Sequence, residues 1–139
     1  GALQPHEWRA RLDEFDWVII AVPSTPDTDK MIGADELGAM KPSASILNFA
    51  RGAVIDQPAL VEALKAKRIH AAFLDVTDPE PLPADDPLWA LDNAHISMHL
   101  SGRSQTKLFP RNAERFLANL ERWARGEPLE SAVDLTLGY

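Results

Sequence analysis

The chain has 139 residues, 45% hydrophobic and 25% charged, with a formal net charge of −7 and no cysteine. This length gives one domain with a real core. The missing cysteines exclude a disulfide framework and a thiolate metal site, and they fit a cytoplasmic protein. The acidic balance argues against nucleic acid and anionic membrane as partners, and no apolar run approaches the roughly 20 residues of a membrane span.

The chain begins with a helical pattern followed by an extended one. Residues 6–15 predict a short amphipathic helix, because Trp8, Leu12 and Phe15 recur at helical spacing. The apolar run 16–22 contains β-branched residues and ends before a proline. Such a continuous run predicts a strand that is buried on both faces.

Two further pairs of helix and strand follow. Residues 34–40 predict a short helix that ends before a proline, and the apolar run 44–50 predicts a second strand. Asp56 is a suitable N-cap for a helix over 57–68, and residues 70–76 predict a third strand. The inward stripe of the helix over 57–68 is expected to consist of Leu60, Ala63 and Leu64.

The last part of the chain predicts a strand and a long helix. The fourth apolar run, 94–100, predicts the strand, and the helix after it has Pro110 in its first turn or at a kink. Gly126 and Pro128 are expected to end this helix. One face of the helix carries Phe109, Ala113, Phe116, Leu117 and Leu120.

Apolar strands that alternate with helices predict an α/β fold, a doubly wound parallel sheet of about four strands with helices on both faces. Right-handed crossovers place the carboxyl end of every strand along one rim, which is where ligands bind in open sheets. The residues of this sequence that could bind a ligand or take part in catalysis lie at or just beyond these strand ends. The residues concerned are Pro23 and Thr28, Asn48 to Gly52, Asp75 and Glu80, and His99 to Gly102.

Arg51 and Glu80 each have a structural interpretation and a functional one. Arg51 is either a rim arginine paired with a carboxylate or a bidentate clamp for an anion, and Gly52 would let the backbone approach a ligand closely. Glu80 is either a solvated loop carboxylate or an acid held in one direction by Pro79 and Pro81. Taken one residue at a time, both alternatives stay open.

His99 is either a strand histidine with a satisfied hydrogen bond or the group that moves a proton. His95 lies roughly 13 Å from His99 along a strand, which excludes a shared metal ion, so no metal site is expected. Asp75 either caps a loop or accepts a hydrogen bond from a ligand amide. An arginine for an anion and a carboxylate-bound histidine suit interconversion of a carbonyl and an alcohol beside a carboxylate, with a hydride source that no side chain supplies.

Four segments, VPSTPDT, NFARGAVID, LDVTDPEPLP and MHLSG, occur in this order with helices of suitable length between them. In these segments the chain resembles the nicotinamide-dependent D-isomer-specific 2-hydroxyacid dehydrogenases, which include glyoxylate/hydroxypyruvate reductases. The likeness runs from about residue 12 to residue 139. It implies a partial Rossmann-type sheet, NAD or NADP as cofactor, and a small 2-oxo or 2-hydroxy acid as substrate.

The resemblance also implies roles for single residues. Arg51 would hold the carboxylate and carbonyl of the 2-oxo acid, His99 would give a proton to the carbonyl oxygen, and Glu80 would pair with His99. Asp75 would receive the nicotinamide carboxamide. The other residues that it implies for cofactor binding are Val22, Pro23, Thr28, Phe49, Ala50, Arg51, His99, Ser101 and Gly102.

The chain departs from the family's pattern in several places. Met98 and Leu100 stand where proline and isoleucine are usual, Thr77 stands where an aromatic is common, and no glycines have the Gly-x-Gly-x-x-Gly spacing that seats a pyrophosphate. Residues 1–139 are therefore expected to be the carboxyl-terminal part of a dinucleotide-binding domain, inactive alone. The strand over 16–22 would have an open edge, which predicts a homo-oligomer. A non-catalytic module that binds nicotinamide nucleotide or a partner is the alternative.

Overall fold

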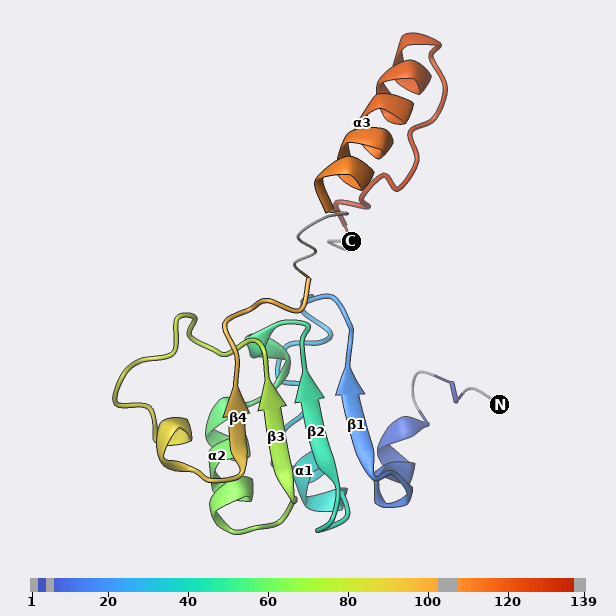
Figure 1. Ribbon diagram of the computed structural model, residues 1–139. Coiled ribbons are helices and arrows are strands. Elements are labelled where there is room, and N and C mark those ends of the chain that lie inside the picture. The colour runs from blue at the N-terminus through green and yellow to red at the C-terminus, as the bar shows by residue number, and fades with distance from the viewer. Residues whose placement is uncertain (1–2, 5–6, 103–107, 137–139) are drawn as a thin grey trace. The chain divides into compact units, whose positions relative to one another are not determined.

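The structure is a computed structural model that describes residues 3–4, 7–102 and 108–136. It divides into two compact units, Gly1–His99 and Leu100–Tyr139. The first unit contains a sheet of parallel strands in the order β1-β2-β3-β4, whose carboxyl ends all point the same way in Figure 1. The strands are β1 (Trp17–Ile20), β2 (Ser45–Asn48), β3 (Ala71–Leu74) and β4 (Ala94–Ile96). The predicted parallel sheet of four strands is confirmed.

The helices of the first unit follow the predicted order. Helices α1 (Ala34–Ala39) and α2 (Gln57–Lys65) lie together behind the sheet in Figure 1. Short 3₁₀ segments complete the unit: η1 (Trp8–Glu14), η2 (Gly52–Val54) and η3 (Pro87–Ala90).

Helix α2 begins and ends through identifiable caps. The carboxylate of Asp56 accepts a hydrogen bond from the Ala59 amide at 3.2 Å, which confirms Asp56 as the N-cap. The helix ends at Lys65 instead of reaching residue 68, because Lys67 adopts a left-handed backbone with φ 52°. The amides of Lys67 and Arg68 then bond back to the carbonyls of Leu64 and Ala63, which is the Schellman arrangement.

The core lies between the sheet and the two α-helices. The predicted inward stripe of α2 is confirmed, since Leu60, Ala63 and Leu64 are all buried. On the sheet, Ile46 and Ala72 are fully buried, and such burial of apolar surface is the main favourable term in folding. The largest fully buried apolar side chains are Leu37, Ile46, Val54, Leu60, Leu64, Ile69 and Leu88.

The prediction that the first strand is buried on both faces is wrong. Ile20 is buried, but Trp17 and Ile19 are 56% and 58% exposed. Both lie on an edge strand, and α1 and α2 occupy only one side of the sheet. An apolar run has the same composition whether one face or two are covered, so the sequence pattern could not distinguish the two cases.

The uncovered face of the sheet carries a continuous apolar row. The strand register places Ile19 beside Leu47, Leu47 beside Phe73, and Phe73 beside His95. The Phe73 ring stacks on the His95 ring with centroids 4.6 Å apart, and it contacts the Trp17 ring at 5.7 Å. The sequence predicted helices on both faces of the sheet. Within the first unit, α-helices cover one face.

The predicted short helix near the amino end is present as the 3₁₀-helix η1, which is wound more tightly than the α-helix that its apolar spacing indicates. Leu12 is its buried residue, and such limited packing gives little support to a regular α-helix. A polar contact also joins it to α1: Arg9 Nε donates to Glu36 Oε1 at 2.8 Å.

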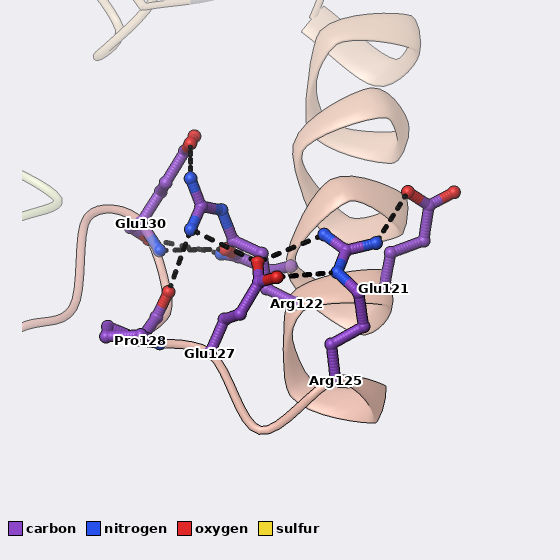
Figure 2. Close-up of polar contacts among 7 residues, drawn as sticks. Glu121, Arg122, Arg125, Glu127, Pro128 and Glu130 are labelled. Atoms are coloured by element: carbon purple, nitrogen blue, oxygen red, sulfur yellow. Dashed lines mark hydrogen bonds and ion pairs between the residues drawn. The ribbon is translucent and has the colours of Figure 1, made fainter.

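The second unit consists of α3 (Leu108–Ala124) and the segment that follows it. The helix has Pro110 in its first turn and ends before Gly126, whose φ is 69°, as predicted. Figure 2 shows Arg122 and Arg125 reaching from the helix to the returning segment. Arg122 binds Glu130 at 2.7 Å, and Arg125 binds Glu127 at 2.8 Å. The hydrogen bond from Arg125 lowers the pKa of the exposed Glu127 carboxyl.

The apolar face of α3 is exposed within this unit. Its large side chains include Phe109 at 78% and Phe116 at 66% exposure. The other exposed large apolar residues of α3 are Leu108, Leu117, Leu120 and Trp123. In the ranges that the structure describes, no helix is both long enough and apolar enough to cross a membrane.

Candidate active site

The turn after β2 is built around a buried asparagine. Asn48 is 1% exposed, and its Nδ2 donates to the Arg51 carbonyl at 2.9 Å while its Oδ1 accepts from the Ala50 amide at 3.0 Å. One side chain thus closes the turn on itself and satisfies two backbone groups. The Arg51 side chain remains exposed, with Nη1 donating to the Ala50 carbonyl at 2.6 Å.

Gly52 brings this turn against the loop that follows β3. A Cβ at position 52 would lie 2.0 Å from the Thr77 carbonyl oxygen and 2.6 Å from the Asp78 amide nitrogen. Real Cβ atoms do not approach backbone so closely, so this contact requires glycine. The arginine turn and the loop that carries Glu80 are therefore in direct contact.

The loop after β3 is braced by α2. Gln57 Oε1 accepts from the Asp78 amide at 3.0 Å, and Gln57 Nε2 donates to Asp86 at 3.0 Å. Thr77 is buried, and its hydroxyl donates to the Pro79 carbonyl at 2.9 Å. Sequence reasoning gave Gln57 no role. The feature that could have pointed to it is its position as the first residue of α2, directly after the N-cap Asp56.

Glu80 and His99 are joined by a side-chain hydrogen bond at this edge of the sheet. His99 Nδ1 lies 2.7 Å from Glu80 Oε1, and each side chain is 42% exposed. The His99 backbone has a positive φ of 52°, and its amide donates to the Asp75 carbonyl at 2.9 Å. Because Nδ1 is engaged by the carboxylate, Nε2 is the ring nitrogen available to exchange a proton with a ligand.

The fourth strand is shorter than predicted, and this changes the direction of His99. The strand ends at Ile96, and the left-handed backbone at His99 breaks the alternation expected over 94–100. His95 stacks on Phe73 in the sheet, whereas His99 contacts Glu80 in a loop. The two histidines therefore occupy separate environments.

Asp75 connects the ends of three neighbouring strands. Its amide donates to the Asn48 carbonyl at 2.9 Å, and its carbonyl accepts from the His99 amide. Its carboxylate accepts from the Ser97 hydroxyl at 2.5 Å. Sequence reasoning gave Ser97 no role, since only the fold brings the serine hydroxyl to the aspartate.

A cavity of about 350 Å³ opens beside these groups. Its lining combines two carboxylates and an imidazole with a mostly apolar wall, as is usual for sites that bind small organic molecules. The lining residues are Asp75, Thr77, Glu80, Pro81, Leu82, Trp89, Ile96, Ser97, Met98 and His99. In the part of the chain that the structure describes, no three or more His, Asp or Glu side chains are placed to hold a metal ion.

The loop after β1 is tied to the segment that follows Arg51. Thr28 Oγ1 donates to the Pro23 carbonyl at 2.7 Å, which closes the loop. The Lys30 amide donates to the Ala53 carbonyl at 2.8 Å, just beyond the arginine turn. Pro23 and Thr28 thus belong to the same connected group of strand-end loops as Arg51.

The remaining predicted cofactor residues differ in their surroundings. Val22 is half-buried and packs against the core, and Ala50 is buried, whereas Phe49 is 39% exposed. Ser101 and Gly102 belong to the second unit, where both are exposed. The roles implied for all of these residues stay predictions.

Comparison with known proteins gives a family match over most of the chain. The family model described as D-isomer specific 2-hydroxyacid dehydrogenase, NAD binding domain, matches residues 2–101. A glyoxylate reductase from Korarchaeum cryptofilum is 43% identical over 116 residues, which cover 84% of this chain and 35% of that protein. A glyoxylate/hydroxypyruvate reductase B from Enterobacter agglomerans is 48% identical over 89 residues, 64% of this chain and 28% of that protein.

A solved structure agrees with this match. The crystal structure of a D-isomer specific 2-hydroxyacid dehydrogenase from Xanthobacter autotrophicus Py2, in complex with NADPH and MES, superimposes with a TM-score of 0.88 at 35% identity. The match covers 97% of this chain and 55% of that one. The chain spans about a third of the length of the two curated relatives. The predicted Rossmann-type α/β fold is confirmed.

Proposed function

Because the chain belongs to the D-isomer specific 2-hydroxyacid dehydrogenase family, we propose that the whole protein interconverts a 2-oxo acid and a D-2-hydroxy acid by hydride transfer. The observation that carries this proposal is the contact of 2.7 Å between His99 Nδ1 and Glu80 Oε1 at the carboxyl ends of the strands. An imidazole oriented by a carboxylate is a suitable proton donor and acceptor for a carbonyl–alcohol pair.

The cofactor is NAD or NADP, as the matched NAD-binding domain and the NADPH-bound neighbour indicate. The donor and acceptor groups of the site fit the nicotinamide end of such a molecule. The Asp75 carboxylate lines the cavity and can accept a hydrogen bond from the carboxamide N–H. When bound, the cofactor supplies or accepts the hydride. The four-stranded sheet then serves as the nicotinamide side of a dinucleotide-binding domain.

His99 moves the proton in this proposal. With Nδ1 held by Glu80, a protonated ring carries a second proton on Nε2, which can be given to the carbonyl oxygen during reduction. A neutral ring presents Nε2 as an acceptor, which can take the hydroxyl proton during oxidation. Glu80 keeps the ring in one orientation through its contact with Nδ1.

Arg51 holds the acid end of the substrate. Its guanidinium can grip a carboxylate through two parallel hydrogen bonds, which a point charge cannot do. Asn48 fixes the turn beneath Arg51, and Gly52 keeps that turn against the loop of Glu80. The anion clamp and the proton donor thus stand on loops that contact each other.

We take glyoxylate and hydroxypyruvate as the first substrates to test, because the two curated relatives are named as reductases of these acids. Both have a carbonyl next to a carboxylate, which matches the groups offered by His99 and Arg51. The protein is proposed to act as a homo-oligomer on these small molecules.

The test is steady-state oxidation of NADH and NADPH by the full-length protein with each acid. We expect turnover with at least one acid, and Arg51→Lys should lower kcat/KM about a hundredfold because the bidentate grip is lost. Arg68→Lys is the matched control: Arg68 is exposed near the amino end of β3, away from the rim, and should leave kcat/KM unchanged.

Two results would contradict the proposal in different ways. Tight binding of a nicotinamide nucleotide without turnover of any 2-oxo acid would favour the non-catalytic module. Near-normal activity of Arg51→Lys would leave the reaction standing and remove Arg51 from its role.

A further inference from the structure

The Ser97 hydroxyl makes a short hydrogen bond to the carboxylate expected to face the cofactor. Ser97 Oγ lies 2.5 Å from Asp75 Oδ1, at the short end of the range for a hydroxyl that donates to a charged oxygen. Ser97 follows β4, and Asp75 follows β3. Both residues line the same cavity as His99 and Glu80.

The backbone around this bond is already fixed without the serine side chain. The Ser97 amide donates to the Leu74 carbonyl at 2.9 Å, and the His99 amide donates to the Asp75 carbonyl at 2.9 Å. These two bonds hold the segments together, so the serine hydroxyl is not needed to join the strand ends. What the hydroxyl adds is restraint on the rotation of the Asp75 carboxylate.

We propose that Ser97 is a positioning residue, whose hydroxyl orients the Asp75 carboxylate to accept the carboxamide of a nicotinamide ring. This inference rests on the proposed function, in which Asp75 meets that carboxamide. A carboxylate has about four acceptor sites, so a bond from Ser97 is compatible with a second bond from an amide. Fixing an acceptor before binding reduces the entropy lost when the ligand arrives.

The test measures binding of two ligands to the full-length protein by calorimetric titration. The reduced cofactor contains nicotinamide, whereas ADP-ribose, or its 2′-phosphate if the protein prefers NADPH, lacks it. Ser97→Ala should weaken the reduced cofactor about tenfold and change the affinity for the ADP-ribose ligand by less than about twofold. Ser97→Thr keeps a hydroxyl at the same atom and should restore wild-type affinity.

A double substitution asks whether Ser97 acts through Asp75. In an Asp75→Ala background, Ser97→Ala should have little further effect on cofactor binding, since the group it orients is absent. Melting temperatures of all variants are measured alongside, so that loss of folding is recognised. In the active enzyme, Ser97→Ala should raise KM for the cofactor more than it lowers kcat, and the pH dependence of kcat should keep its shape.

Several outcomes would overturn the inference. They are cofactor affinity unchanged in Ser97→Ala, an equal loss of ADP-ribose affinity, failure of Ser97→Thr to rescue, or additive effects with Asp75→Ala. If wild-type protein binds no nicotinamide nucleotide at all, the proposed function fails and this inference falls with it. If wild type reduces 2-oxo acids while Ser97→Ala binds cofactor normally, only the inference fails.

Discussion

A Cβ on Gly52 would lie 2.0 Å from the carbonyl oxygen of Thr77. Residue 52 follows the arginine of the proposed anion clamp, and residue 77 lies in the loop that leads to Glu80. The contact therefore sets the spacing between the two loops that carry the proposed chemistry.

Gly52→Ala should push these loops apart. The clash is with backbone, which cannot move aside as a flexible side chain can, so we expect a loss of about 1–3 kcal/mol in the free energy of unfolding. Displacement of Arg51 relative to Glu80 should also lower kcat/KM by at least tenfold. Urea unfolding and steady-state kinetics of the full-length protein measure the two effects.

Gly38→Ala is the matched control. Gly38 lies in α1, and a Cβ there would meet nothing within 4 Å. Alanine should raise the free energy of unfolding by about 0.5–1 kcal/mol, because glycine is the poorer helix former, and leave kinetics unchanged. If both alanine variants behave alike, the contact between Gly52 and Thr77 has no special importance.

His99→Gln should lower turnover of the full-length enzyme by about two to four orders of magnitude, because glutamine cannot transfer a proton.

Glu80→Gln should lower turnover less than His99→Gln does. The imidazole remains in this variant but loses the carboxylate that orients it at 2.7 Å. Steady-state kinetics in both reaction directions distinguish the roles. Activity of His99→Gln near that of wild type would refute proton transfer by this residue.

The contact between Arg9 and Glu36 should make stability depend on pH. Burial raises the pKa of the Glu36 carboxyl, but the hydrogen bond from Arg9 and the backbone amides of Gly33 and Glu36 lower it more, so the pKa lies below its ordinary value. A carboxyl with a depressed pKa stabilises the folded state above the unfolded pKa. That stabilisation is lost as the pH falls below about 4.5 and through the folded pKa.

Glu36→Gln should therefore cost about 0.5–1 kcal/mol of unfolding free energy at neutral pH and almost nothing in acid. Urea unfolding at a series of pH values measures the difference between wild type and variant. Arg9→Ala should remove part of the same difference, because Arg9 donates one of the hydrogen bonds. If the difference in unfolding free energy between wild type and Glu36→Gln stays constant across the pH series, the Glu36 carboxylate is not the source of the pH dependence.

The 139-residue chain alone should self-associate and show no turnover of NADH or NADPH with glyoxylate. β1 is an edge strand, whose open backbone can pair with another chain, and its Trp17 and Ile19 side chains are exposed on the face of the sheet. Ile19→Lys should shift sedimentation toward the monomer, whereas Leu135→Lys, at a residue that is 91% exposed outside the sheet, should not. A wild-type chain that stays monomeric at high concentration, or one that turns over cofactor, would contradict this expectation.

The central part of the fold could be predicted from local sequence signals. The strands β2 and β3 are short apolar runs, and α2 has its N-cap and inward stripe where Asp56 and Leu60 predicted them. Such signals act over a few residues and need no knowledge of distant partners. The exposure of Ile19 could not be predicted in this way, because it depends on which segments cover a distant face of the sheet.

In the candidate site, too, some residues could be predicted from the sequence and others could not. Glu80 and His99 were paired from the order of family-like segments, and the structure has them in contact, while their catalytic roles stay predictions. Ser97 and Gln57 were missed because their partners, Asp75 and Asp78, are more than 20 residues away in the chain. Hydrogen bonds between a side chain and a remote loop leave no periodic signal in a sequence.

Main-chain hydrogen bonds connect the carboxyl ends of β2, β3 and β4, and this has a practical consequence. The Asp75 amide donates to the Asn48 carbonyl, and the His99 amide donates to the Asp75 carbonyl, so these links depend on backbone groups that every residue type except proline possesses. Side chains such as Asp75 and His99 can therefore be exchanged without removing those links, whereas Gly52 and the buried Asn48 are needed for the shape of the rim. The chemistry of the site can then be altered without loss of the fold. Libraries that vary the proposed catalytic and binding side chains at the strand ends are therefore a practical starting point for engineering.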